Sequence, residues 1–308
     1  MIEQSEKLYS FGGNKMHNFY IIQWGNDFFD NYNYGAEISF KDDGSVSFSA
    51  PFMPTGEVIK SWTSKSKFHV HRKTPLLPLL AAEKSYTFNI NATADHSVAM
   101  QVRIEFLDIS GTVIEEANFS ELSGEFVYPA KATSYQLALL NNHHQQIYFY
   151  YLTISETELL EKFEPQIELE QGIICFKQRA EMKENRIVIA KKSKTVNYFA
   201  LNDFGNQYFV LTNLKTANVL IQMRYLYSIL HQNLTKHSIC RIERGISFET
   251  LDKSYHILPY ALSIILPNAK LKNMDSIDEE LNLPTIKLRI SVNELAYHIL
   301  EEFVSVSH

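Results

Sequence analysis

Hydrophobic and polar residues alternate along much of the first half of the chain. In residues 100–106, MQVRIEF, every second residue is apolar and the residues between are polar. A period of two is typical of a strand with one buried face. The pattern recurs in AEISF (36–40), SYTFNI (85–90) and SYQLALL (134–140), and turn sequences follow at KDDGS (41–45) and DISG (108–111). Residues 20–155 contain no convincing helical pattern and predict about eight to ten short strands in a two-sheet β-sandwich of jelly-roll type, similar to carbohydrate-binding modules.

The pattern changes after residue 158. Residues 155–171, SETELLEKFEPQIELEQ, are charged, contain Pro165, and predict a short helix followed by a linker. Beyond them we expect strands over 172–178, 186–192, 208–212, 238–243 and 285–290, and helices over 214–232, 251–265 and 291–304. Pro259 should kink or break the second of these helices. The predicted organisation is a sandwich over 1–158, a linker over 159–171 and a smaller α/β or α+β domain over 172–308.

Composition supports this division into two parts. The chain has 308 residues, 45% of them hydrophobic, which is enough for a large core and two domains. Residues 1–158 contain 11 Lys and Arg against 18 Asp and Glu, whereas residues 159–308 contain 18 against 17. The first part is acidic and the second is nearly neutral, so neither has the basic surface of a nucleic-acid-binding protein.

The cysteines and the N-terminal sequence indicate in which cellular compartment the protein is expected. Cys175 and Cys240 lie far apart in apolar runs without metal-ligand spacing, so both are expected to be reduced core residues. The first 15 residues have no apolar segment of the signal-peptide type, and no apolar run approaches the roughly 20 residues of a membrane helix. We therefore expect a soluble intracellular protein.

Motifs for catalysis are not found. The sequence has no G-x-S-x-G nucleophile elbow, no Walker motif and no G-x-G-x-x-G loop, so we expect neither catalytic nor cofactor-binding residues. His69 and His71 would share one face of a strand, where an H-x-H pair can bind a metal ion. No acidic or third histidine partner is near in sequence, which favours a polar strand face without metal.

Two polar segments are candidates for ligand or partner contact. Amide and imidazole groups in the loop NNHHQQ (141–146) can hydrogen-bond sugar hydroxyls, although the loop can equally be a plain turn. Tyrosines in the turn-rich DNYNYG (30–35) can stack on sugars. The candidate surface residues are Tyr32, Tyr34, Asn141, Asn142, His143 and His144. Trp24 and Trp62 are alternatives, but large aromatic residues usually lie in the core, which we favour here.

The segments PFMPTGEVIKSW (51–62) and RKTPLLPLL (72–80) carry a specific resemblance. They resemble the signature of the third and smallest accessory secretory protein of the bacterial accessory Sec system. The similarity covers about residues 20–155, with Thr55 where serine is expected. The matching positions are Trp24, Gly25, Asp43, Gly44, Met53, Pro54, Gly56, Ile59, Trp62, Thr74, Pro75, Leu77, Pro78, Leu79 and Leu80.

The resemblance implies a non-catalytic, cofactor-free subunit. Its implied partners are two other accessory secretory proteins, one glycosyltransferase-like and one esterase- or acetyltransferase-like, the accessory SecA motor ATPase, and glycosylated serine-rich repeat adhesins. It implies a cytoplasmic location with peripheral membrane contact at most. It does not cover residues 160–308, whose composition suits a docking module. The alternative is a glycan-active enzyme whose catalytic half is the C-terminal domain.

Overall fold

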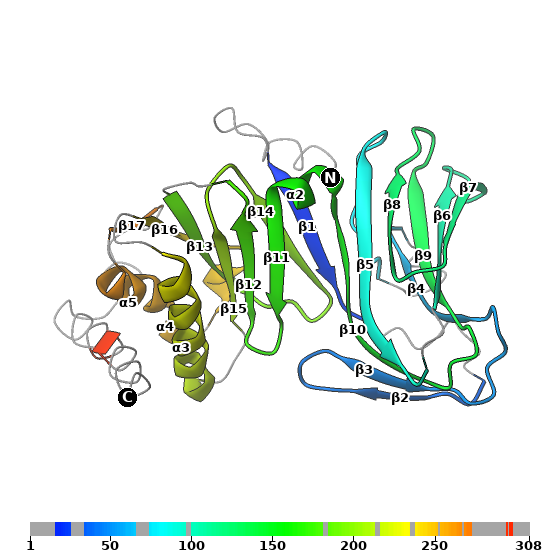
Figure 1. The fold of residues 1–308 in the computed structure, drawn as a ribbon, viewed down its shortest axis with the longest axis horizontal. Helices are drawn as coiled ribbons and strands as arrows, with labels where there is room; N and C mark the ends of the chain where they lie inside the picture. The colour runs from blue at the N-terminus through cyan, green and yellow to red at the C-terminus, as the bar shows by residue number, and fades with distance from the viewer. Residues whose placement is uncertain are drawn as a thin grey trace. The chain divides into compact units, whose positions relative to one another are not determined.

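A computed structural model describes residues 16–25, 34–65, 74–96, 100–180, 184–212, 216–234, 238–251, 253–266, 268–272, 294 and 296–297. These residues belong to two compact units (Figure 1). The first contains 16–161 and 193–200, and the second contains 162–192 and the described residues from 201 onward.

The first unit is a β-sandwich, as predicted. One sheet has the order β14-β1-β10-β3-β2, with β5 pairing with β10 and β8 pairing with β5; the other has the order β4-β9-β6-β7. Pairing is antiparallel from β1 through β10. The strands are β1 (His17–Ile22), β2 (Glu37–Phe40), β3 (Val46–Ser49), β4 (Val58–Thr63), β5 (Ser85–Ala94), β6 (Gln101–Leu107), β7 (Val113–Phe119), β8 (Ser123–Val127), β9 (Ser134–Leu140), β10 (Gln146–Glu156) and β14 (Val196–Leu201).

Strand β10 organises the larger sheet. Its first half pairs with β3 and its second half with β1, while β5 runs along its other edge. The register with β5 shifts between Phe149 and Tyr151, so Tyr150 is the extra residue of a β-bulge. The bulge explains why the buried positions on β10 step by three from Phe149 to Leu152 instead of by two.

An aromatic cluster fills the core between the two sheets. Trp62 on β4 lies edge-on to Trp24, with ring centroids 6.1 Å apart, and 5.4 Å from the ring of Phe149 on β10. The indole N–H of Trp62 donates a hydrogen bond of 3.1 Å to the carbonyl oxygen of Gln23. Both tryptophans are buried, which confirms the prediction that they are core residues.

The second unit has a six-stranded sheet of order β11-β12-β15-β13-β16-β17. In this order, β11, β12 and β15 pair antiparallel with one another, whereas β15, β13, β16 and β17 pair in parallel. The elements are α2 (Thr157–Lys162), which ends at the start of the unit, β11 (Phe163–Glu168), β12 (Ile173–Gln178), β13 (Glu184–Lys191), β15 (Gln207–Thr212), α3 (Thr216–Asn233), β16 (Ile239–Arg244), α4 (Lys253–His256), α5 (Leu258–Ile265) and β17 (Ala269–Leu271). This confirms the prediction of a small α/β part.

Helices cover one face of this sheet. Alternate residues of the central strands, such as Ile187 and Ile189 on β13, form one core with Met223, Leu226 and Leu230 of α3. Residues of α5 extend the same core. The predicted helix over 214–232 is confirmed, and the one over 251–265 is divided because Pro259 lies in the first turn of α5. The strand expected over 285–290 lies outside the described residues, as does most of the helix expected over 291–304.

Two expectations about the boundary between the units need correction. The linker expected over 159–171 contains the end of α2 and strand β11, which pairs with β12 along its whole length. Pro165 is tolerated there because β11 is an edge strand of its sheet. Strand β14 lies between β13 and β15 in sequence, but it pairs with β1 of the sandwich and not with those strands. The sandwich therefore includes residues from well beyond position 158.

We expect Trp62→Ala to lower the free energy of unfolding by about 3–5 kcal/mol, because it leaves a cavity in the aromatic cluster and removes the bond to Gln23. Urea denaturation of the full chain measures this. The matched control is Phe52→Ala, nearby in sequence but 82% exposed, which should change stability by no more than about 0.5 kcal/mol. Equal unfolding midpoints for Trp62→Ala and the wild type would contradict this packing.

Both cysteines should be unreactive in the folded protein. They are free and buried against the helices, and burial raises the pKa of Cys175 to about 12 and that of Cys240 to about 11. A raised pKa keeps a thiol protonated, and the thiolate is the reactive form. We expect no modification by iodoacetamide at pH 8.5 until denaturant is added, when both thiols should react. Rapid labelling without denaturant would contradict their burial.

Candidate functional site

The signature segment around residue 53 is a loop that a buried asparagine side chain helps to hold in place. We call residues 50–57 the signature loop. The side-chain amide of Asn141, at the end of β9, donates hydrogen bonds to the carbonyl oxygens of Met53 (2.8 Å) and Pro54 (3.2 Å). The backbone of Asn141 also bonds Gly56 and Glu57, each at 2.8 Å. Gly56 adopts φ +86°, which other residues rarely accept, so the loop needs glycine there.

Several of the remaining signature residues also have structural roles. Gly25 has φ +78°, and a methyl group on it would lie 2.4 Å from the side chain of Leu76. The N–H groups of Leu76 and Leu77 both donate to the carbonyl oxygen of Thr63 at 3.0 Å, which joins this segment to β4. Trp24, Met53, Trp62 and Leu77 are buried, while Pro54, Thr74 and Pro75 are exposed and Pro78 is half-buried. The signature thus describes how the sandwich is built.

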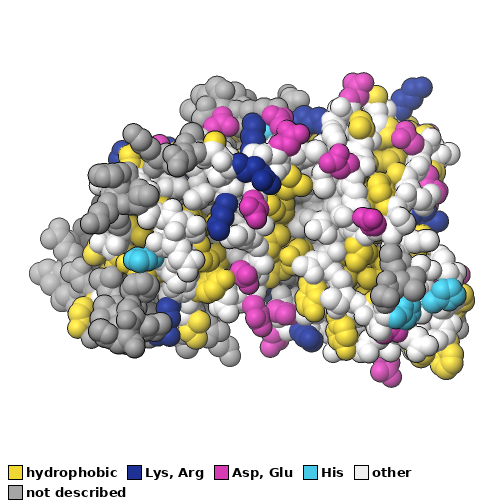
Figure 2. Space-filling view, in the orientation of Figure 1, with side chains coloured by type: hydrophobic (Ala, Val, Ile, Leu, Met, Phe, Trp, Pro, Cys, Tyr) yellow, Lys and Arg dark blue, Asp and Glu magenta, His cyan; other side chains and the backbone are white. Residues whose placement is uncertain are grey.

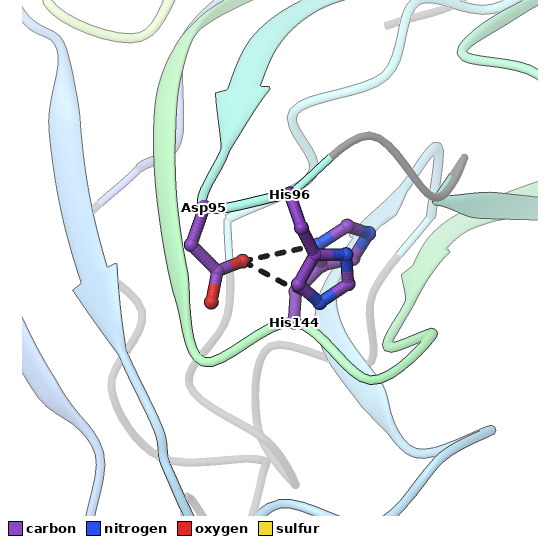
Figure 3. A group of neighbouring side chains, drawn as sticks. All are labelled: Asp95, His96 and His144. Carbon is purple, nitrogen blue, oxygen red and sulfur yellow. Dashed lines mark hydrogen bonds and ion pairs between the residues drawn. The ribbon is translucent and has the colours of Figure 1, made fainter.

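Beside the signature loop lies a cluster of Asp95, His96 and His144 (Figure 3). Asp95 and His96 directly follow β5, and His144 belongs to the loop between β9 and β10. The ring of His144 is buried, with Nδ1 3.2 Å from Oδ1 of Asp95, and its backbone N–H donates to Oδ1 of Asn141 at 3.0 Å. One loop therefore supports both the signature loop and this cluster.

The carboxylate of Asp95 is held in its ionised form. Its burial would raise the pKa, but hydrogen bonds from the backbone N–H of Gln145 (3.0 Å) and from His144 outweigh that, and the pKa is lowered. The ring of His96 stacks on that of His144, with centroids 4.2 Å apart and an interplanar angle of 20°. His96 Nε2 lies 2.9 Å from the carbonyl oxygen of His143. Figure 2 shows imidazoles (cyan) on the surface of the sandwich.

The structure changes the interpretation of the predicted surface residues. Asn141 is 1% exposed and His144 is 3% exposed, so neither is available to a sugar, and we correct both to structural residues. His143 is exposed, with its ring 3.1 Å from the hydroxyl of Thr55, and Asn142 is half-buried. Tyr34 is half-buried and packs against the sandwich core. Tyr32, His69 and His71 lie outside the described residues.

A second surface, which the sequence interpretation missed, lies on the outer face of the larger sheet. We call Tyr148, Tyr150 and Tyr151 of β10, with Asn91 of β5, the tyrosine face. Asn91 donates to the hydroxyl of Tyr151 (2.9 Å), and Gln146 donates to that of Tyr148 (2.6 Å). Asn91, Tyr148 and Tyr150 are exposed, and Tyr151 is half-buried. The sequence IYFYY (147–151) could have revealed this face. Its alternation predicts that Tyr148 points away from the core into which Ile147 and Phe149 point.

The fold and these surfaces define a β-sandwich protein with a mixed α/β unit and an exposed face of tyrosine and amide side chains. The family model described as accessory Sec secretory system ASP3 matches residues 31–156, which lie within the sandwich. The chain belongs to this family, since it is 31% identical over 127 residues to the accessory Sec system protein ASP3 of Streptococcus gordonii, covering 41% of this chain and 79% of that protein.

Other known proteins are similar over a comparable share of the chain. The accessory Sec system protein ASP3 of Staphylococcus aureus is 28% identical over 125 residues, which is 41% of this chain and only 39% of that relative's length. A crystal structure of accessory secretory proteins 1, 2 and 3 from Streptococcus pneumoniae contains a chain with 29% identity and a TM-score of 0.42, covering 44% of this chain and 94% of that one. No helix in the described part of the chain is long and apolar enough to cross a membrane.

Asn141→Ala tests the structural role of this side chain. The change removes the hydrogen-bond partner of the carbonyls of Met53 and Pro54 and of the N–H of His144. A buried polar group without a hydrogen-bond partner lowers stability by about 1–3 kcal/mol. We expect a loss of roughly 2–4 kcal/mol in urea denaturation, with faster proteolysis at the signature loop. Gln145→Ala, an exposed side chain in the same loop, is the control and should have almost no effect. A stable Asn141→Ala variant would contradict this role.

Proposed function

We propose that this chain is a non-catalytic subunit of an accessory Sec system, which binds partner proteins and the glycan of serine-rich repeat adhesins during their export. The observation that carries the proposal is the family match, because it covers most of the sandwich. The proposed partners are the two other accessory secretory proteins, the accessory SecA motor ATPase and the glycosylated adhesin. The proposed location is the cytoplasm, at the inner face of the membrane.

The glycan part of the proposal rests on the tyrosine face. Tyrosine rings offer apolar surface to the C–H face of a sugar ring, and their hydroxyls remain polar. Around them, the outward positions of β5 carry the exposed amides of Asn89 and Asn91, and Thr93 lies beside Tyr148 in the strand register. Amide groups donate and accept hydrogen bonds, as recognition of sugar hydroxyls requires. These side chains project from strands, so their spacing is fixed before a ligand arrives.

The contacts on this face are few, so binding to a single sugar should be weak, on the order of millimolar, or about −4 kcal/mol. Many sugars on one repeat chain would raise the overall affinity through multivalency. The residues of the second unit are proposed to dock onto partner proteins. In this division of roles, the tyrosine face of the sandwich binds the glycan of the adhesin.

The test is a titration of glycosylated and unglycosylated serine-rich repeat peptides against the full chain and against the assembled complex. We expect the glycosylated peptide alone to bind, and the double change Tyr148→Ala and Tyr151→Ala to weaken that binding at least about tenfold, or 1.4 kcal/mol. Ile109→Ala, an exposed apolar residue at the turn between β6 and β7, is the control and should leave binding unchanged.

Several results would count against the proposal. Equal binding of both peptides would remove the glycan role. A larger loss in Tyr32→Ala with Tyr34→Ala than in the β10 variant would move the site to the segment around residues 30–35. Hydrolysis or transfer of the glycan by this chain alone would contradict the non-catalytic role and favour an enzyme.

A further inference from the structure

We propose that Asp95, His96 and His144 form a binding site for a divalent transition-metal ion such as Zn²⁺, which would join the end of β5 to the loop between β9 and β10. The three residues offer two imidazole nitrogens and a carboxylate oxygen, all within 4.8 Å of one another. Two histidines with one carboxylate are a donor set that zinc uses in proteins. The site shares no residue with the tyrosine face.

One pair of donor atoms already has the spacing of a tetrahedral site, and the third ligand has to move closer. With metal–ligand distances of about 2.0–2.1 Å, the ligand atoms of such a site lie roughly 3.3 Å apart. Oδ1 of Asp95 lies 3.2 Å from Nδ1 of His144 and 3.8 Å from Nε2 of His96. A small movement of His96 closes the remaining gap, and this is the ligand with room to move because its side chain is 37% exposed.

Asp95 is held in place by a hydrogen bond of the kind that orients metal ligands, and His144 by its backbone and by the burial of its ring. The backbone N–H of Gln145 binds Oδ2 of Asp95, which leaves Oδ1 directed toward the two histidines (Figure 3). His144 is fixed through its backbone bond to Asn141 and by burial of its ring. When the metal takes Nε2 of His96, the 2.9 Å hydrogen bond between that nitrogen and the carbonyl oxygen of His143 is lost, and the carbonyl can then accept a hydrogen bond from a metal-bound water in the fourth position.

The arrangement of the rings supports the same conclusion. The two imidazole rings stack with centroids 4.2 Å apart, and each offers a nitrogen within 4.8 Å of a carboxylate oxygen of Asp95. A divalent ion bound by all three groups would tie the two loops together. Because His144 lies in the loop whose Asn141 holds the signature loop, the ion would also stabilise that end of the sandwich.

The experiment is calorimetric titration of ZnCl₂ into the full-length chain, prepared without a histidine tag and treated with EDTA. We expect about one equivalent to bind with a dissociation constant on the order of 1 µM or below, and the melting temperature to rise with zinc but not with MgCl₂. Cobalt(II) in place of zinc should give the visible absorption bands of a four-coordinate site.

Variants assign the binding to these residues. His96→Ala and Asp95→Asn should each weaken zinc binding at least tenfold, and both change exposed residues, so the chain should still fold. His143→Ala removes a neighbouring exposed imidazole that is not a proposed ligand and should bind zinc normally. Absence of zinc binding, full binding by His96→Ala, or loss of binding in His69→Ala with His71→Ala would each overturn the proposal.

Discussion

Packing of Trp62 against Trp24 and Phe149 is the interaction on which the sandwich depends. It joins β4 of one sheet to β10 of the other, and the bond from Trp62 to Gln23 fixes the chain just before Gly25. Gly25 in turn leaves space for Leu76, whose segment is bound to the end of β4. The family signature, spread over more than 50 residues of sequence, therefore describes one connected region of core and loops. The buried members of the signature are explained by the needs of the fold, so they say little about the ligand.

Function is then to be sought on surfaces that this framework positions. Strand β10 contributes inward residues to the core and outward tyrosines to an exposed face, so the aromatic cluster also sets the spacing of that face. The loop after β9 also serves two parts of the structure. Asn141 hydrogen-bonds the signature loop, and His144, three residues later, hydrogen-bonds Asp95. A rigid sandwich with polar and aromatic groups at fixed positions is suited to binding, which agrees with the role proposed here for the chain.

Local patterns predicted much of the fold but little of the candidate site. Strand β6 and helix α3 have clear periodicity and were found, because the pattern of burial is present in their own residues. Strands β11 and β14 were missed, because what makes them strands is pairing with distant partners, β12 and β1. Asn141 and His144 appeared to be surface residues because a polar loop is usually exposed. Their burial depends on Met53 and Asp95, which lie far away in the sequence, and the proposed metal site likewise joins His144 to residues well before it in the chain.

The central claim is that this chain acts as a binding subunit alongside the other accessory secretory proteins. The most direct measurement is co-expression of the full chain with the two other accessory secretory proteins of the same organism, followed by size-exclusion chromatography with mass determination. The account predicts that all three co-elute in one complex of defined stoichiometry, with this chain adding no activity on glycan by itself. Elution of this chain alone, at the mass of the free protein and with both other proteins present and folded, would contradict it.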